Sequence, residues 1–139
     1  MNTALEKCFI ALIISAALGV YANAEQIKPF ISDGCSVFPD GHLKENKLWL
    51  HCCKAHDYAY WQGGTSTQRK AADKALQQCV AQENQPSIAM LMLVGVRIGG
   101  SPLFPSPFRW GYGWSYPRGY KALTKQEQLN IKKAAKHAF

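Results

Sequence analysis

The chain has 139 residues, with 16 Lys or Arg against 9 Asp or Glu, and its net charge at pH 7 is +7. This length suits one compact domain with one core and leaves no room for a second. The basic balance favours anionic partners such as acidic lipid head groups, lipopolysaccharide or nucleic acid, through an attraction that salt weakens. Charge alone does not choose among them.

The N-terminal residues have the pattern of a signal peptide. Lys7 precedes an apolar run from Phe9 to Val20, and the small-x-small triplet Ala22 to Ala24 follows. The apolar run is about a dozen residues long, against the roughly 20 that a membrane span needs. We therefore expect cleavage after Ala24, which removes residues 1–24 and exports residues 25–139 as one domain, to the periplasm or beyond.

The exported part keeps four cysteines: Cys35, Cys52, Cys53 and Cys79. In an oxidising compartment this number favours two disulfide bonds, which stabilise a small core. The alternative is a zinc site that uses these thiols with His51 or His56. It lacks the Cys-x-x-Cys or His-x-x-x-His spacing of such sites, so we expect disulfides.

Turn-forming residues dominate Glu25 to Gly41, which is expected to be a loop. A helix is predicted from about Asn46 to Trp61, where apolar residues recur at spacings of three and four, and Gly63-Gly64 ends the pattern. Thr67 is the expected N-cap of a second helix, from about Gln68 to Gln82. The short connection makes the two helices antiparallel neighbours.

Three further segments follow. Ile88 to Ile98 is apolar and is expected to be a buried helix or strand of the core, too short to cross a membrane. Gly99 to Tyr120 is dense in Gly, Pro and aromatic residues, which predicts an irregular segment with turns or a short hairpin. Thr124 and Glu127 have the capping-box spacing that begins a final helix.

Residues with chemical potential concentrate in the first predicted helix. His56 and Tyr60 are four apart and share a helix face, while Asp57 points about 100° away from His56. If Cys52 bonds Cys79, His56 lies about 6 Å along the first helix from the bridge. A further residue, Asp73, lies about 9 Å along the second helix in the same direction, between His56 and Tyr60 in height.

The disulfide pairing has three alternatives. A bond between the adjacent Cys52 and Cys53 is awkward inside a helix, because neighbouring side chains diverge. A bond from Cys53 to Cys79 turns a different helix face toward Asp73 and fits less well. We prefer Cys35 with Cys53 and Cys52 with Cys79.

A histidine held by a buried carboxylate is a competent general base, because the carboxylate fixes the tautomer and stabilises the imidazolium. No Ser or Cys is placed as a covalent nucleophile and no Gly-x-Ser-x-Gly occurs, so water is the natural nucleophile for His56. Asp57 suits a hard cation with oxygen ligands, completed by loop carbonyls around Cys35. Such a cation would polarise a carbonyl group and stabilise an oxyanion.

The run Cys-Cys-x-x-His-Asp-x-x-Tyr, from Cys52 to Tyr60, resembles the active-site helix signature of secreted phospholipase A2 proteins. Asp73, six residues before Cys79, matches the Asp and Cys of their second helix. The resemblance covers roughly Asp33 to Val80, and it implies the disulfide pairing preferred above.

The resemblance implies a mainly α, small, disulfide-linked phospholipase A2-like domain with two antiparallel active-site helices. His56 would be the base that activates water, Asp73 and Tyr60 its hydrogen-bonded support, and Asp57 a ligand of Ca²⁺. The implied reaction is calcium-dependent hydrolysis of the sn-2 acyl ester of phospholipids at a membrane surface, by a peripheral enzyme.

The calcium loop departs from the family pattern. The family commonly has Cys-Gly-x-Gly, whereas this chain reads Gly-Cys-Ser-Val-Phe-Pro-Asp-Gly from Gly34 to Gly41. By position, the candidate calcium ligands are the carbonyls of Gly34, Ser36 and Phe38, with Asp33 or Asp40 as alternatives. The departure favours a second hypothesis, an inactive secreted module of the same fold that binds anionic lipid or protein.

Cations and aromatic rings fill the segment from Asn84 to Gln126, which has no acidic residue. This combination suits a membrane interface. We expect most of the rings to fill the core, and Trp110, Trp114 and Arg109 are candidates for flanking the substrate entrance. Nucleic-acid binding would explain the charge but not the His, Asp and Cys pattern, so it is not expected.

Overall fold

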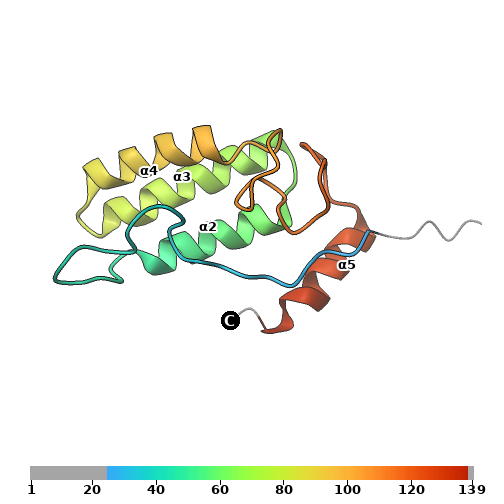
Figure 1. Ribbon diagram of the computed structural model, residues 1–139, viewed down its shortest axis with the longest axis horizontal. Helices are drawn as coiled ribbons and strands as arrows, with labels where there is room; N and C mark the ends of the chain where they lie inside the picture. Colours follow the sequence, from blue (N-terminus) through green and yellow to red (C-terminus); the bar gives the residue numbers. More distant parts are fainter. Residues whose placement is uncertain (1–24, 138–139) are drawn as a thin grey trace, which may run out of the picture.

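The computed structural model describes residues 25–137, which are mainly helical (Figure 1). Its helices are α2 (Leu50–Gln62), α3 (Ser66–Gln82), α4 (Pro86–Gly99) and α5 (Lys125–Ala134), followed by a 3-10 turn at Ala135–His137. Within this range there is no strand beyond an isolated bridge between His42 and Glu45. The expectation of a small, mainly α, disulfide-linked domain is confirmed. The predicted signal peptide lies outside the described residues.

The helix α2 begins four residues later than predicted. Its first turn starts at Leu50, because the preceding residues form a series of turns and the Trp49 amide is bonded to the Asp40 carbonyl at 3.0 Å. At the other end, Gly63 has φ +69° and its amide bonds the carbonyls of Ala59 and Tyr60. Glycine adopts this backbone without steric cost, so the predicted stop signal holds.

The N-cap of α3 is Thr65, and the prediction of Thr67 is wrong. The Thr65 hydroxyl accepts a hydrogen bond from the Gln68 amide, and the Gln68 side chain accepts one from the Thr65 amide. This reciprocal capping box satisfies two amides that have no partner within the helix, so Thr67 already lies inside α3. The predicted capping box of Thr124 and Glu127 at α5 is present.

The apolar segment after α3 forms a helix, α4, with Pro86 in its first turn. The expectation that it belongs to the core is only partly right. Ala89 and Met92 are buried, but four large side chains are at least half exposed: Met90, Leu91, Val94 and Ile98. The reason is that α4 packs on α3 with one side only, while α3 also contacts α2 (Figure 1).

Two buried clusters make up the core. The first joins α2, α3 and α4 and contains Trp49, Cys52, Cys53, Leu76, Val80, Ala89 and Met92. The second ties the N-terminal segment, the end of α2 and α5 together through Ile27, Trp61, Trp114 and Ile131. No helix within residues 25–137 has the length and apolar character needed to cross a bilayer.

The segment from 99 to 120 is irregular and shows turns rather than a hairpin. Trp110 and Trp114 are fully buried and donate their indole N–H groups to carbonyls at the α2–α3 connection. Arg109 is also buried, and donates to the carbonyls of Gly111 and Trp114. Their candidacy for the substrate entrance is therefore wrong, because buried polar groups with internal partners hold the core together.

The structure contains the disulfides Cys35–Cys53 and Cys52–Cys79, the pairing preferred from the sequence. Neighbouring side chains on a helix diverge, so the adjacent cysteines of α2 point to different partners. One bridge ties α2 to the loop before it, and the other ties α2 to α3. The two bridges thus fix the elements that carry the candidate site.

Candidate active site

His56, Tyr60 and Asp73 meet between α2 and α3. The Nε2 atom of His56 lies 3.1 Å from Asp73 Oδ1, and the Tyr60 hydroxyl donates to the same oxygen at 2.6 Å. All three side chains are buried, and Asp73 is completely inaccessible. The Cys52–Cys79 bridge sits about one turn away along α2 and sets the register of the two helices. The structure therefore brings together the residues that the sequence placed in this pair.

The charge state of this cluster follows from its hydrogen bonds. Burial favours a higher pKa for the Asp73 carboxyl, but hydrogen bonds from His56 and Tyr60 outweigh it and the net shift is downward. Burial and the Asp73 hydrogen bond raise the pKa of Tyr60, so its hydroxyl stays a donor. An ionised carboxylate only accepts hydrogen bonds, so the Nε2 atom of His56 must carry the proton. In the neutral form of the imidazole, the lone pair is then on Nδ1.

Two arginines complete the surroundings of Asp73, and the sequence reasoning missed both. Arg97 of α4 places Nε 2.6 Å from Asp73 Oδ2. The N–H is not aligned with that oxygen, so the contact is an ion pair rather than a hydrogen bond. Arg69 of α3 donates to the Tyr60 hydroxyl at 3.0 Å. Arg69 lies four residues before Asp73, a spacing that places both on one helix face and could have identified it.

A cavity of about 410 Å³ opens over this cluster. His56 and Asp57 lie on one wall, the loop from Gly34 to Phe38 lies on another, and Leu91 and Val96 of α4 contribute apolar surface. A second cavity of about 600 Å³ shares Ser36, Asp57 and Phe108 with the first. Asp57 therefore lines both cavities.

The loop before α2 is held against Asp57 by specific bonds. The Ser32 hydroxyl donates to Asp57 Oδ2 at 2.6 Å and accepts from the Gly34 amide at 3.2 Å. Asp40 Oδ1 accepts from the Cys35 amide at 2.8 Å. Together with the Cys35–Cys53 bridge, these bonds place the loop beside the carboxylate. Ser32 and the structural role of Asp40 were not predicted.

Asp57 lies near other groups that carry potential oxygen ligands for a hard cation. Burial raises the pKa of Asp57 to about 7, and the nearby Asp33 and Asp40 carboxylates add to the rise despite the Ser32 hydrogen bond. Gly34, Ser36 and Phe38, whose carbonyls are the predicted ligands, line the same cavity as Asp57. Within residues 25–137, no hydrogen bond ends on these three carbonyl oxygens. Carbonyl and carboxylate oxygens are the ligands that Ca²⁺ prefers.

The two acidic alternatives are less free. Asp33 Oδ1 accepts from the Ser36 hydroxyl at 2.7 Å, and Asp40 Oδ1 is engaged by the Cys35 amide. Both carboxylates stabilise the loop that would present the carbonyls. Their negative charge still makes the surroundings of Asp57 attractive to a cation.

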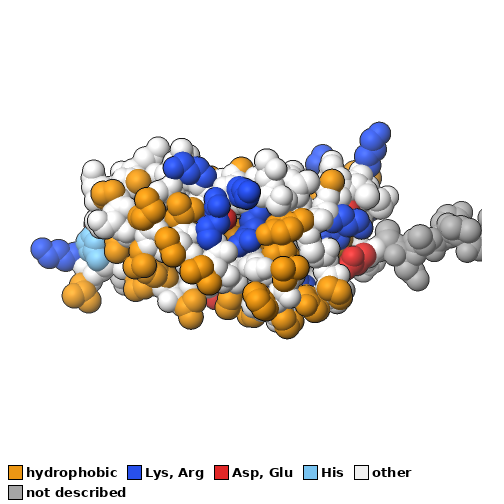
Figure 2. All heavy atoms as spheres, turned by 90° about the horizontal axis from the view of Figure 1, so that it is seen from above, with side chains coloured by type: hydrophobic (Ala, Val, Ile, Leu, Met, Phe, Trp, Pro, Cys, Tyr) orange, Lys and Arg blue, Asp and Glu red, His pale blue; other side chains and the backbone are white. Residues whose placement is uncertain are grey.

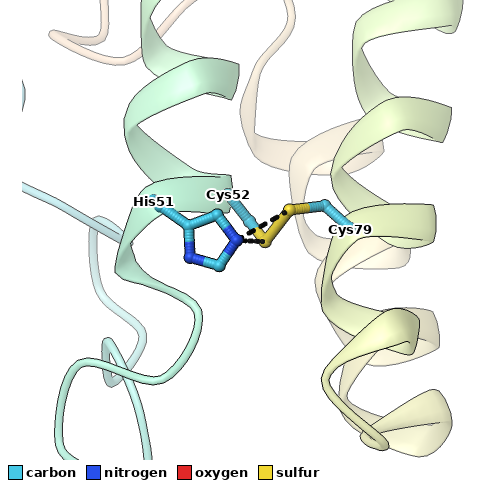
Figure 3. A group of neighbouring side chains, drawn as sticks. All are labelled: His51, Cys52 and Cys79. Carbon is cyan, nitrogen blue, oxygen red and sulfur yellow. Dashed lines mark hydrogen bonds between the residues drawn. A yellow bond between two sulfur atoms is a disulfide. The ribbon is translucent and has the colours of Figure 1, made fainter.

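A second group of potential metal ligands, His51, Cys52 and Cys79, lies near the start of α2 (Figure 3). His51 Nε2 is 3.4 Å from Cys52 Sγ and 3.5 Å from Cys79 Sγ, and 3.5 Å from a Glu83 oxygen. The two sulfur atoms form a disulfide bond, so no thiolate is available as a ligand. This group does not fit a zinc site and is a surface histidine beside a structural bridge.

Comparisons of the chain with protein-family models, curated proteins and solved structures gave no match. The resemblance to secreted phospholipase A2 proteins therefore depends on the motif from Cys52 to Tyr60 and on the Asp73 and Cys79 spacing.

Proposed function

We propose that the protein hydrolyses the sn-2 acyl ester of phospholipids, with His56 as general base and with dependence on Ca²⁺. The observation that carries the proposal is the contact of His56 with the inaccessible, ionised Asp73 at the base of a largely apolar cavity. A carboxylate that fixes the imidazole tautomer is the arrangement that general-base catalysis needs. The Cys-Cys-x-x-His-Asp-x-x-Tyr resemblance gives the substrate class.

The proposed mechanism begins with water at the free Nδ1 of His56. Nδ1 takes a proton from the water as its oxygen attacks the ester carbonyl, and Asp73 stabilises the imidazolium that results. His56 then returns the proton to the glycerol oxygen as the bond to the acyl group breaks, which releases a fatty acid and a lysophospholipid. Tyr60 holds Asp73 in place throughout.

Asp57 and the loop carbonyls of Gly34, Ser36 and Phe38 would hold Ca²⁺ beside the reacting ester. When bound, the ion would supply Lewis-acid stabilisation of the developing oxyanion and a positive site for the phosphate. The Asp57 position at the junction of two cavities supports this assignment, because the acyl chain and the polar part of a phospholipid need separate spaces.

Surface composition supports a lipid interface as the working place of the protein. Figure 2 shows apolar side chains with Lys and Arg among them on the face that carries α4. Exposed large side chains there include Leu91, Val94 and Ile98, and Leu91 also lines the cavity. Extended exposed apolar surface marks an interaction site in a small protein. We place the protein outside the cytoplasm, since its two disulfides need an oxidising compartment.

The test is fatty-acid release from mixed phospholipid vesicles by the oxidised protein, with calcium and with chelator. Calcium-dependent release that His56→Gln abolishes supports the proposal. His42→Gln is the matched control, because His42 is an exposed histidine that pairs with Glu45 and not with Asp73. Equal loss in both variants, or release that persists in chelator, contradicts it.

One observation favours the alternative, an inactive module that binds anionic lipid or protein. The loop lacks the Cys-Gly-x-Gly pattern, and Val37 has φ +49°, a conformation that a β-branched residue rarely adopts. Vesicle binding in chelator with no release under any condition would identify this alternative.

A further inference from the structure

Arg97 connects α4 to Asp73, the carboxylate of the His56–Asp73 pair. Its Nε atom meets Asp73 Oδ2 at 2.6 Å, and one of its terminal nitrogens donates to the Lys70 carbonyl at 3.3 Å. The Arg97 side chain is 40% exposed, whereas Asp73 is inaccessible. The guanidinium therefore reaches inward from the surface and closes the side of Asp73 that His56 and Tyr60 leave open.

Arg69 fastens the end of α4 to the same cluster. It donates to the carbonyls of Val96 and Arg97, each at 2.9 Å, and to the Tyr60 hydroxyl. Both carbonyls belong to the last turn of α4, where a cation is favourable. The Val96 carbonyl also accepts a hydrogen bond from the Gly100 amide at 3.0 Å. Arg69 thus caps α4 from the neighbouring helix.

The orientation of Asp73 depends on both of its oxygens. The terminal torsion of an aspartate has a broad energy profile, so hydrogen bonds to Oδ1 alone leave the carboxylate able to turn. The ion pair with Arg97 holds Oδ2 and restricts this motion. Because α4 also forms the apolar wall of the cavity, a shift of that wall would move Arg97 and release Asp73.

We propose that Arg97 is a positioning residue for the His56–Asp73 pair, and that Arg69 links this positioning to the seating of α4. The structural part is independent of any reaction, while its effect on turnover rests on the proposed function. Arg97 acts through Asp73 and does not contact the substrate. Removal of the Arg97 charge should loosen the His56–Asp73 pair and leave substrate binding nearly unchanged.

The experiment compares Arg97→Met, which keeps length and loses charge, with Arg97→Lys, which keeps a cation. Lys70→Met is the control, because Lys70 is an exposed cation on the adjacent turn of α3. The first readout is the proton NMR signal of the His56 Nε2–H group, which is buried and donated to a carboxylate. We expect this slowly exchanging signal to be lost in Arg97→Met and retained in Arg97→Lys and Lys70→Met.

The second readout is kcat and KM on phospholipid vesicles. Arg97→Met should lower kcat by about 10- to 100-fold, the cost of a misplaced catalytic group, with KM little changed. Arg97→Lys should recover most of the loss. If Arg97→Met does not fold, Arg97→Gln replaces it in both readouts.

An unchanged Nε2–H signal in the neutral variants, or the same effect in Lys70→Met, overturns the inference. Absence of hydrolysis by the unmodified protein contradicts the proposed function instead. In that case the NMR comparison still decides whether Arg97 positions the His56–Asp73 pair.

Discussion

The Tyr60 hydroxyl and the Asp73 carboxylate are joined by a 2.6 Å hydrogen bond that crosses from α2 to α3. Tyr60 also stacks beside His56 at 4.2 Å between ring centroids and receives a hydrogen bond from Arg69. Tyr60 therefore contacts both members of the His56–Asp73 pair and the buried Arg69 side chain, and it links α2 to α3. A small displacement of its ring should disturb all three.

Gly100 offers a test of this packing that leaves the His56, Tyr60 and Asp73 side chains unchanged. A Cβ atom at Gly100 would stand 2.7 Å from the Tyr60 hydroxyl and against its ring, whereas one at Gly99 would meet nothing within 4 Å. We expect Gly100→Ala to destabilise the protein by about 1–3 kcal/mol, as overpacking does, and to lower turnover. Gly99→Ala should not destabilise the protein, because Ala is favoured over Gly in a helix. Urea unfolding measures both, and equal effects would contradict the packing described.

Asp57 predicts a pH-dependent and calcium-dependent stability. Its pKa is raised from 3.8 to about 7, chiefly by burial, so it stabilises the protonated fold and that stability is lost as pH rises through this range. At about pH 8 without calcium, Asp57→Asn should be more stable than the unmodified protein by about 1 kcal/mol.

With calcium, the unmodified protein should become more stable than Asp57→Asn, because an ion that binds only the folded state stabilises it. The melting temperature of the unmodified protein should rise with calcium, and that of Asp57→Asn should not. Thermal unfolding in calcium and in chelator provides the measurement. A similar rise in both proteins would place the ion elsewhere.

Glu127 predicts acid sensitivity at the other end of the molecule. Burial favours a higher pKa for this carboxyl, but the Thr124 amide and Arg118 lower it to about 2. Its stabilising contribution is therefore complete above about pH 4.5 and is lost as pH falls toward 2. Glu127→Gln should cost about 2 kcal/mol near neutral pH and flatten the acid limb. Glu45→Gln, at an exposed carboxylate, should do neither in the same pH series of urea melts.

The two disulfides should have separable roles. Removing either pair by Cys→Ala should cost about 2–4 kcal/mol. Loss of Cys35–Cys53 frees the loop beside Asp57 and should mainly weaken the calcium response. Loss of Cys52–Cys79 frees the register of α2 against α3 and should mainly lower turnover at saturating calcium. Calcium titrations of activity distinguish the two, and identical curves would argue against this division.

The contact of His56 with Asp73 was predictable because both distances are set by the helical rise from one bridge, Cys52–Cys79. The capping box of α5 and the Gly63 stop were likewise local signals. Thr65 could have been recognised from its spacing to Gln68, since the same box is repeated there.

Other features depend on tertiary packing and had no local signal. The Arg97 contact exists because α4 crosses α3 at one register, and the spacing of residues along the chain does not encode that register. An apolar helix is usually buried, yet the outer side chains of α4 face solvent. Trp110 and Trp114 looked amphipathic, but the carbonyls that receive their N–H groups become available only in the folded chain.

The most direct test uses a phospholipid with distinguishable acyl chains at the sn-1 and sn-2 positions, presented in vesicles with calcium. The proposed chemistry predicts that the sn-2 fatty acid and the matching lysophospholipid appear in equal amounts, and that Asp73→Asn greatly reduces both. Release of the sn-1 chain, or no release while the protein remains folded and bound to the vesicles, would contradict the account.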